Sequence, residues 1–180
     1  MDHEEYRQAA RYWTERDRAL PAAERMDAAA LRTEIDSFLA SHNTLALAPC
    51  AHGIPRCTPL EYGWRDGAFW IFSEGGLKFL GLEPSTMKGT GGAITVSCAV
   101  FEPYAGFGTL QSAQITGRAR VIDPEDPAFT AAAAAKGIPA TRLPMLARRL
   151  HLIKVTPTEV DYLDSALKEQ GLATRQHLVL

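Results

Sequence analysis

The sequence predicts a mainly β protein in which a six-stranded antiparallel barrel carries helices at its periphery. Hydrophobic residues recur at helical spacing near the N-terminus, whereas from Asn43 onward short β-branched runs alternate with turn residues. The first three of these runs are joined by connections too short for the helical crossover that parallel strands need. Closing an antiparallel sheet into a barrel also removes long exposed edges. With 180 residues, 46% of them hydrophobic, a single domain over 1–180 is expected.

Two helices are expected in the N-terminal region, residues 4–42. The segment 4–18 is polar and amphipathic, as in a helix that docks on another surface. The second helix begins at Asp27, which is a good N-cap residue, and Asn43 can end it. Its apolar residues recur at helical spacing and are Leu31, Ile35, Phe38 and Leu39.

The barrel is expected over residues 43–163, and the polar residues 164–180 are assigned to a C-terminal tail. Arg65-Asp66-Gly67 has the composition of a hairpin turn, and residues 84–92 have that of a loop. An alanine-rich helix is expected over 125–136. The six expected strands are 43–51, 56–64, 68–73, 93–104, 110–122 and 151–163.

Composition excludes several classes of function. The net charge of −2 gives no overall positive field to attract nucleic acid or an anionic membrane. No apolar run is long enough for a membrane span, and the charged N-terminus lacks the apolar stretch of a secretory signal. The cysteines are odd in number and lack CxxC spacing, which argues against a disulfide framework and favours the cytoplasm. Cys50, His52 and Cys57 flank one turn, but small apolar strand residues explain the cysteines more simply than a metal site does.

The first candidate site is the predicted strand that starts at Arg56. Alternate residues of a strand share a face, so Arg56, Thr58 and Leu60 would offer a guanidinium, a hydroxyl and an apolar surface in sequence. The phosphate, ribityl chain and ring edge of a flavin need groups of these kinds. A strand with a solvated arginine at its edge is the alternative.

A second candidate lies where a strand runs through Gly75 and Gly76 toward Lys78. Glycines let the backbone approach a ligand closely, and Ser73 and Lys78 could bind a phosphate. The Walker pattern is absent, and a plain turn with an exposed lysine remains the alternative. On a later strand, the amide of Gln114 can both donate and accept, which suits the edge of a flavin ring, although strand glutamines are usually solvated.

Taken in order, these segments resemble the pyridoxamine 5'-phosphate oxidase-like, FMN-binding split-barrel family. The likeness extends from about residue 13 to 176, and the order and spacing of the motifs make it specific. The matching segments are 43–48, 56–62, 71–79, 99–104, 110–111, 114–117 and 175–176.

The resemblance implies a split barrel and a homodimer with FMN at the interface. It further implies that Phe72 and Ser73 contact the cofactor, that Lys78 holds the phosphate, and that Gln114 approaches the ring, often from the second subunit. The strand that lines the flavin in the family maps onto Arg56, Cys57, Thr58, Pro59, Leu60 and Glu61.

Departures from the family pattern argue against oxidation of pyridoxamine phosphate. The oxidase has a basic pair where this chain has Leu77-Lys78, and a lysine where this chain has Glu61. Its C-terminal Arg and His motif is not recognisable, and Arg175 is only a loose counterpart. Two functions are therefore expected as alternatives. One is an FMN-dependent oxidoreductase reduced by a small molecule such as NAD(P)H. The other is a non-catalytic module that holds FMN, haem or pyridoxal phosphate.

Overall fold

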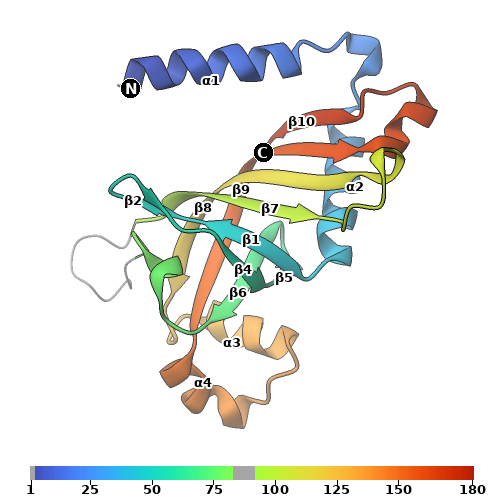
Figure 1. Cartoon of the computed structure of the whole chain (residues 1–180). Helices are drawn as coiled ribbons and strands as arrows, with labels where there is room; N and C mark the ends of the chain where they lie inside the picture. Colours follow the sequence, from blue (N-terminus) through green and yellow to red (C-terminus); the bar gives the residue numbers. More distant parts are fainter. Residues whose placement is uncertain (1–2, 83–91) are drawn as a thin grey trace.

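The computed structural model describes residues 3–82 and 92–180, so the expected loop at 84–92 lies, apart from Gly92, outside the described residues. Figure 1 shows a curled sheet with helix α1 standing off one side and helices α3 and α4 at the opposite end. Among the described residues, no helix is long and apolar enough to cross a membrane. The helices are α1 (His3–Arg18), α2 (Ala28–Ser41), α3 (Pro127–Ala135) and α4 (Leu143–Arg149), and the short 3₁₀ turns are η1 (Ala22–Glu24), η2 (Leu77–Phe79), η3 (Phe107–Thr109), η4 (Ala140–Arg142) and η5 (Ser165–Gln170).

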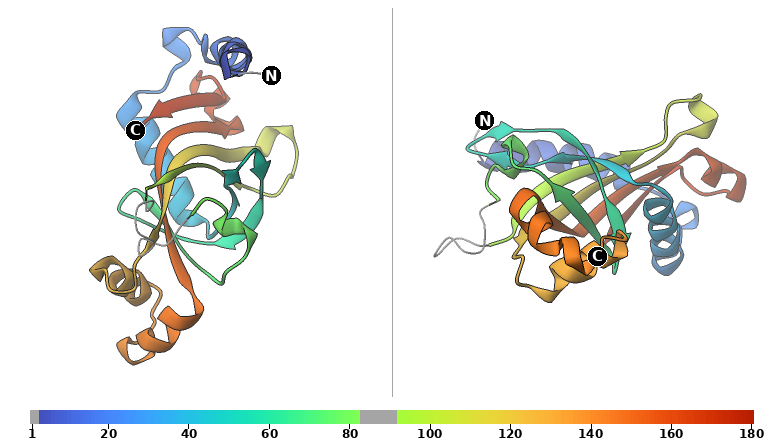
Figure 2. Two further views of the ribbon diagram at one scale, coloured as in Figure 1. Left: turned by 90° about the vertical axis from the view of Figure 1, so that its left-hand side faces the viewer. Right: turned by 90° about the horizontal axis from the view of Figure 1, so that it is seen from below.

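The strands form an antiparallel sheet in the order β4-β1-β7-β8-β9-β6-β5, and β10 pairs with the end of β9. The sheet curls into a half-barrel (Figures 1 and 2), which confirms the mainly β fold class. The short strands β2 and β3 form a separate hairpin. The strands are β1 (Thr44–Ala48), β2 (Cys50–Ala51), β3 (Ile54–Pro55), β4 (Thr58–Glu61), β5 (Gly63–Arg65), β6 (Ala68–Ser73), β7 (Ile94–Phe101), β8 (Gln111–Ile122), β9 (His151–Asp164) and β10 (Arg175–Val179).

Tyr62 divides the expected strand 56–64, because at this residue the chain passes from one edge of the curled sheet to the other. On one side of it β4 pairs with β1, and on the other side β5 pairs with β6, so consecutive strands occupy opposite ends of the ladder. Tyr62 is buried at this crossing, and its hydroxyl donates a hydrogen bond to the Leu39 carbonyl at 2.8 Å. The expectation of one continuous strand was wrong, because residues 58–61 pair with β1 at one edge of the sheet and residues 63–65 pair with β6 at the other.

Other segments also differ from the sequence-based expectation. Pro49 has no N–H to donate and separates β1 from β2 within the expected strand 43–51. Residues 164–180, expected as a polar tail, contain η5 and β10, and β10 pairs with β9. The turn η4 and the helix α4 occupy residues 140–149, for which the sequence predicted no element. Asp27 caps α2 as expected, and its carboxylate accepts hydrogen bonds from the N–H groups of Ala29 and Ala30.

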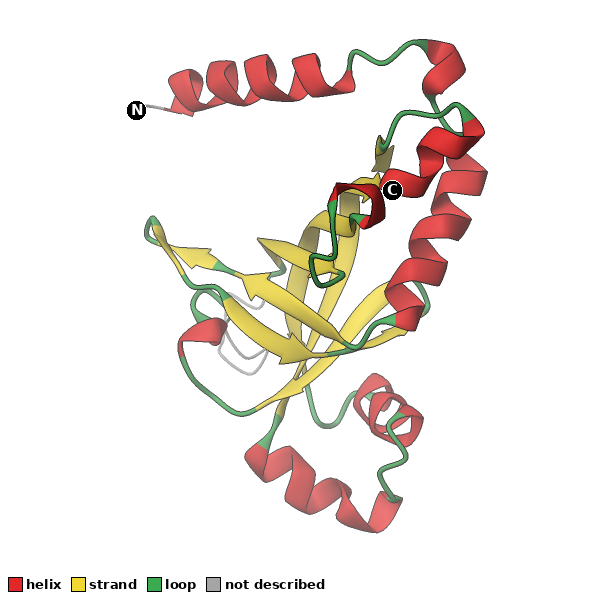
Figure 3. Cartoon of the chain, turned by 45° about the vertical axis from the view of Figure 1, so that its right-hand side comes forward, coloured by secondary structure: helices red, strands yellow, loops and turns green. Residues whose placement is uncertain are grey.

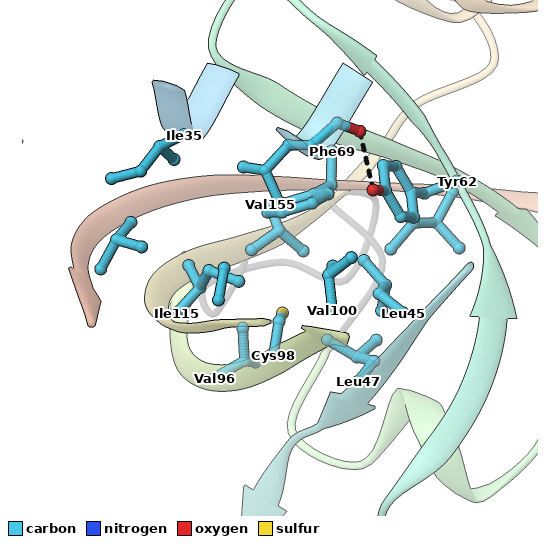
Figure 4. Close-up of a cluster of buried hydrophobic side chains, with 14 of the residues drawn as sticks. Ile35, Leu45, Leu47, Tyr62, Phe69, Val96, Cys98, Val100, Ile115 and Val155 are labelled. Atoms are coloured by element: carbon cyan, nitrogen blue, oxygen red, sulfur yellow. Dashed lines mark hydrogen bonds between the residues drawn. The ribbon is translucent and has the colours of Figure 1, made fainter. Parts of the chain in front are cut away.

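The main core lies on the concave side of the sheet, where α2 packs (Figure 4). A second cluster lies on the outer face of β6, where Trp70 packs with Phe129 of α3 and with α4. Figure 3 shows α3 and α4 as a separate helical layer at that end of the sheet. Buried members of the main core include Leu45, Leu47, Val96, Val100, Ile115 and Val155.

Gly117 lies at a bulge where β8 shifts register against β9. A Cβ at this position would lie 2.9 Å from both the Thr156 carbonyl oxygen and Val155 Cγ1, so backbone would have to move. We therefore expect Gly117→Ala to lower the free energy of unfolding by about 1–3 kcal/mol in a urea titration. Gly108→Ala is the control, because a Cβ there meets no atom within 4 Å. Equal stability of the two variants would contradict the close packing at the bulge.

Candidate functional site

Strand β4 turns the predicted flavin-lining residues to two different faces. Thr58 pairs with Leu47 and Leu60 pairs with Leu45, and Leu60 packs against the main core. The neighbouring residues on the other face are exposed: Cys57 just before the strand, then Pro59 and Glu61. The part of this segment open to a ligand is therefore the face of Cys57, Pro59 and Glu61.

Arg56 precedes β4 and does not belong to it. Its side chain is exposed, and its backbone N–H donates to the Pro49 carbonyl at 3.0 Å, so it continues the hairpin formed by β2 and β3. The three residues of the predicted face therefore do not line one open surface: Arg56 is exposed to solvent, and Leu60 packs against the main core.

Phe72 and Ser73 at the end of β6 also point to opposite sides. The Phe72 ring packs edge-to-face on Phe129 of α3, with centroids 5.4 Å apart. Ser73 is buried and pairs with His151 of β9. Only Phe72 faces the helical layer.

Lys78 lies in η2, directly after the two glycines. Its ammonium donates to the Gly75 carbonyl at 3.0 Å and lies 5.9 Å from the centre of the Phe79 ring. Gly76 has φ of 128°, a conformation that favours glycine. The expected strand–glycine–glycine–lysine arrangement is therefore formed, with the lysine folded back over the turn.

The chain that follows η2 lies against the β2–β3 hairpin. A Cβ at Gly81 would lie 3.7 Å from the Ala51 Cβ, so this segment contacts β2. Figure 1 shows the turn after β6 on the same side of the sheet as β2. Because Arg56 follows β3 directly and Lys78 precedes Gly81 by three residues, the two cations belong to segments that touch each other.

Gln114 is exposed on β8, in register with Ala99 of β7 and Asp161 of β9. In the ladder, β7 and β1 lie between β8 and β4. Within one chain, Gln114 on β8 is therefore separated from β4 by two strands.

A pocket of about 180 Å³ lies between β5, β6 and α3. Glu61 of β4 reaches its edge through an ion pair of 2.9 Å with Lys136. This pocket was not predicted from the sequence, although the alternation of Trp70 and Phe72 on one face of β6 was a signal for a second packed layer. Its lining residues are Gly63, Trp64, Arg65, Trp70, Phe72, Ala132, Ala135 and Lys136.

Three buried titratable groups remain protonated at neutral pH. Burial raises the pKa of the Tyr62 hydroxyl, and it raises the pKa of the Cys98 thiol to about 12. Burial also raises the pKa of Tyr162 to about 12, although Gln111 Nε2 donates to its oxygen at 2.6 Å and opposes this rise. None of the three is a nucleophile at neutral pH. Within 3–82 and 92–180, no three potential metal ligands gather at one point.

Gln176, part of the closing motif of the sequence resemblance, has a structural role here. Its side chain is 3% exposed; its oxygen accepts from the Met26 N–H, and its nitrogen donates to the carbonyls of Glu24 and Ala173. We expect Gln176→Leu to cost about 2–4 kcal/mol of unfolding free energy, because it leaves the Met26 N–H and the Ala173 carbonyl unpaired and removes one of the two hydrogen bonds to the Glu24 carbonyl. Chemical denaturation measures this loss. Gln170→Leu, at an exposed position, should stay close to wild type, and a similar loss in both variants would contradict the role of Gln176.

No protein-family model matches the sequence, and no curated protein matches it. Solved structures do resemble it. A FAD-binding protein from Mesorhizobium loti is 19% identical with a TM-score of 0.50, over 72% of this chain and 89% of that one. HutZ, the heme storage protein of Vibrio cholerae, is 16% identical with a TM-score of 0.54, over 71% of this chain and 89% of that one.

A conserved hypothetical protein from Mycobacterium tuberculosis, Rv2991, is 18% identical with a TM-score of 0.57, over 85% of this chain and 92% of that one. The chain therefore has the split-barrel fold of the pyridoxamine 5'-phosphate oxidase-like proteins, as the sequence resemblance implied. Structures of this fold include both flavin-binding and heme-binding proteins.

Proposed function

We propose that this protein binds FMN beside β4 and η2 and acts as a flavin-dependent oxidoreductase in the cytoplasm. The observation that carries the proposal is the contact of Gly81 with Ala51, which places the turn of Lys78 against the β2–β3 hairpin that Arg56 follows. A flavin phosphate carries nearly two negative charges at neutral pH, and charge-assisted hydrogen bonds are the strong ones.

The residues at this end fit a phosphate. A Cβ at Gly75 would meet no atom within 4 Å, so the backbone of the glycine turn is open to a ligand. The Lys78 ammonium bonds only a backbone carbonyl of the same turn among the described residues, and a phosphate is a stronger acceptor for it. Ser73 is buried beside this turn, where its hydroxyl is a further donor.

The ring would lie on the exposed face of Cys57, Pro59 and Glu61, toward Phe72. The pocket of about 180 Å³ under α3 suits a single ring rather than three fused rings, so one chain alone does not enclose a flavin. A homodimer with FMN at its interface would exclude water from the ring, and Gln114 of a second copy would contact it there. Bound FMN supplies hydride transfer, and the chain binds and orients it.

The absorbance spectrum of the purified protein tests the proposal, before and after addition of FMN. We expect flavin bands that NAD(P)H bleaches under anaerobic conditions, together with a dimer mass in solution. Bleaching by dithionite but not by NAD(P)H would favour the non-catalytic module. A colourless protein that FMN does not stabilise against heat would contradict flavin binding.

Haem is the second candidate, because HutZ shares the fold and His52 offers an exposed imidazole at the tip of the β2–β3 hairpin. Haem iron commonly takes an axial histidine. Titration with haemin separates the two cofactors: a Soret band that is lost in His52→Ala would favour haem over FMN. Pyridoxal phosphate would share the Arg56 and Lys78 contacts, and its own absorbance identifies it in the same titration.

A further inference from the structure

The small pocket under α3 has an aromatic wall. The rings of Trp70 and Phe72 line it from β6, β5 contributes Gly63 and Arg65, and the short side chains of Ala132 and Ala135 leave room below the helix. A cavity of about 150 Å³ is enough to hold benzene, so a pocket of about 180 Å³ accepts one six-membered ring with a small substituent.

The rim of this pocket is positively charged on its inner side. In the ion pair between Lys136 and Glu61, the lysine side chain is 25% exposed and the carboxylate is 69% exposed. In the pair between Arg65 and Asp66, the corresponding fractions are 33% and 77%. Both cations thus line the pocket, while both carboxylates are solvated. Water screens the two exposed carboxylates more strongly than the two less exposed cations, so the potential inside the pocket is positive.

A further cation reinforces this potential. Lys154 Nζ lies 5.0 Å from the centre of the Trp70 ring, and the Arg65 guanidinium carbon lies 4.9 Å from it. Arg120 stands directly opposite Lys154 on the neighbouring strand, and like charges in such positions repel. In the part of the chain that the structure describes, neither Arg120 nor Lys154 has a carboxylate within ion-pair distance. An anion bound nearby would offset this repulsion.

We propose that the pocket is a ligand site for a small planar aromatic carboxylate. The ring would lie between Trp70, Phe72 and the alanines of α3, and the carboxylate would face Lys136 and Arg65 at the rim. The site shares Phe72 with the proposed flavin region, but it is formed within one chain and does not depend on a bound flavin.

Benzoate is the probe, and calorimetric titration of the full-length protein measures its binding. We expect benzoate to bind at least about tenfold more tightly than benzamide, its uncharged counterpart, because a charge-assisted contact is lost. Cyclohexanecarboxylate keeps the charge but not the flat ring, and it should also bind more weakly. Equal affinity for benzoate and benzamide, or no saturable benzoate binding, would overturn the proposal.

Two variants locate the site. Lys136→Met should weaken benzoate binding by about tenfold and leave benzamide unchanged, while Lys168→Met, on an exposed 3₁₀ turn, is the matched control. Ala135→Leu should abolish binding of both probes by filling the pocket; residue 135 is exposed at the end of α3, so folding should survive. Retained benzoate binding in Ala135→Leu would place the ligand elsewhere.

The same titration with and without added FMN separates this inference from the proposed function. Benzoate binding without any flavin binding would contradict the flavin proposal alone. Flavin binding without benzoate binding would contradict the aromatic carboxylate site alone.

Discussion

Replacing both Arg56 and Lys78 by alanine is expected to weaken FMN binding by more than about tenfold. Each residue would give the phosphate a charge-assisted hydrogen bond, and such bonds are typically worth about 1.5–3 kcal/mol. Arg56 is exposed and Lys78 bonds only its own glycine turn among the described residues, so the fold should be unaffected. Fluorescence titration of free FMN, which quenches on binding to many proteins, measures the dissociation constant, and thermal unfolding checks the stability.

Riboflavin provides the sharpest control, because it keeps the ring and ribityl chain but has no phosphate. The double variant should bind riboflavin as the wild type does. A second double variant, Arg142→Ala with Lys168→Ala, removes the same charge from exposed turns and should keep its FMN affinity. Unchanged FMN affinity in the first variant, or an equal loss for riboflavin, would show that the phosphate lies elsewhere.

Phe69→Ala should be the most destabilising single change in the barrel. Phe69 is 0% exposed, and its ring packs edge-to-face on Tyr62 and Trp64, with centroids 4.9 and 4.7 Å away. Loss of a buried phenyl ring costs about 3–5 kcal/mol. For a chain of this size that corresponds to a fall in Tm on the order of 10 °C. The location adds to the effect, because Phe69 packs on Tyr62, the residue at which the chain passes from β4 at one edge of the sheet to β5 at the other.

Phe101→Ala is the matched control, since the same side chain at the end of β7 is 63% exposed. Its free energy of unfolding should stay within about 0.5 kcal/mol of wild type. Comparable losses in the two variants would mean that Phe69 does not contribute through burial. Scanning calorimetry of both proteins in one buffer decides between these outcomes.

Several elements could be predicted because their signals are local. The helix after Asp27 depends on a capping carboxylate and on apolar residues at a spacing of three and four, both of which are properties of adjacent residues. The runs that became β6, β7, β8 and β9 are rich in aromatic or β-branched residues and bounded by turn residues, so their approximate positions also follow from the sequence.

The local backbone of the candidate site could be predicted in part, whereas its role in binding stays a prediction. The glycine turn and Lys78 formed as expected, because φ preferences act on single residues. The shared face of Arg56, Thr58 and Leu60 was less useful than expected, since alternation does not say which face is buried. The structure turned Leu60 toward the core.

By itself, the amino-acid sequence determined the fold class, the main helices and strands, and the cation and glycine pattern. These depend on spacing, capping and backbone preference, which act between residues near in the chain. Only the tertiary structure decided the break between β4 and β5 at Tyr62 and the pairing of β10 with β9. It also decided the contact of Gly81 with Ala51, which places the turn of Lys78 against the hairpin that precedes Arg56, and the pocket under α3. Each of these joins residues far apart in sequence, and their proximity results from how the whole sheet curls and buries its apolar surface.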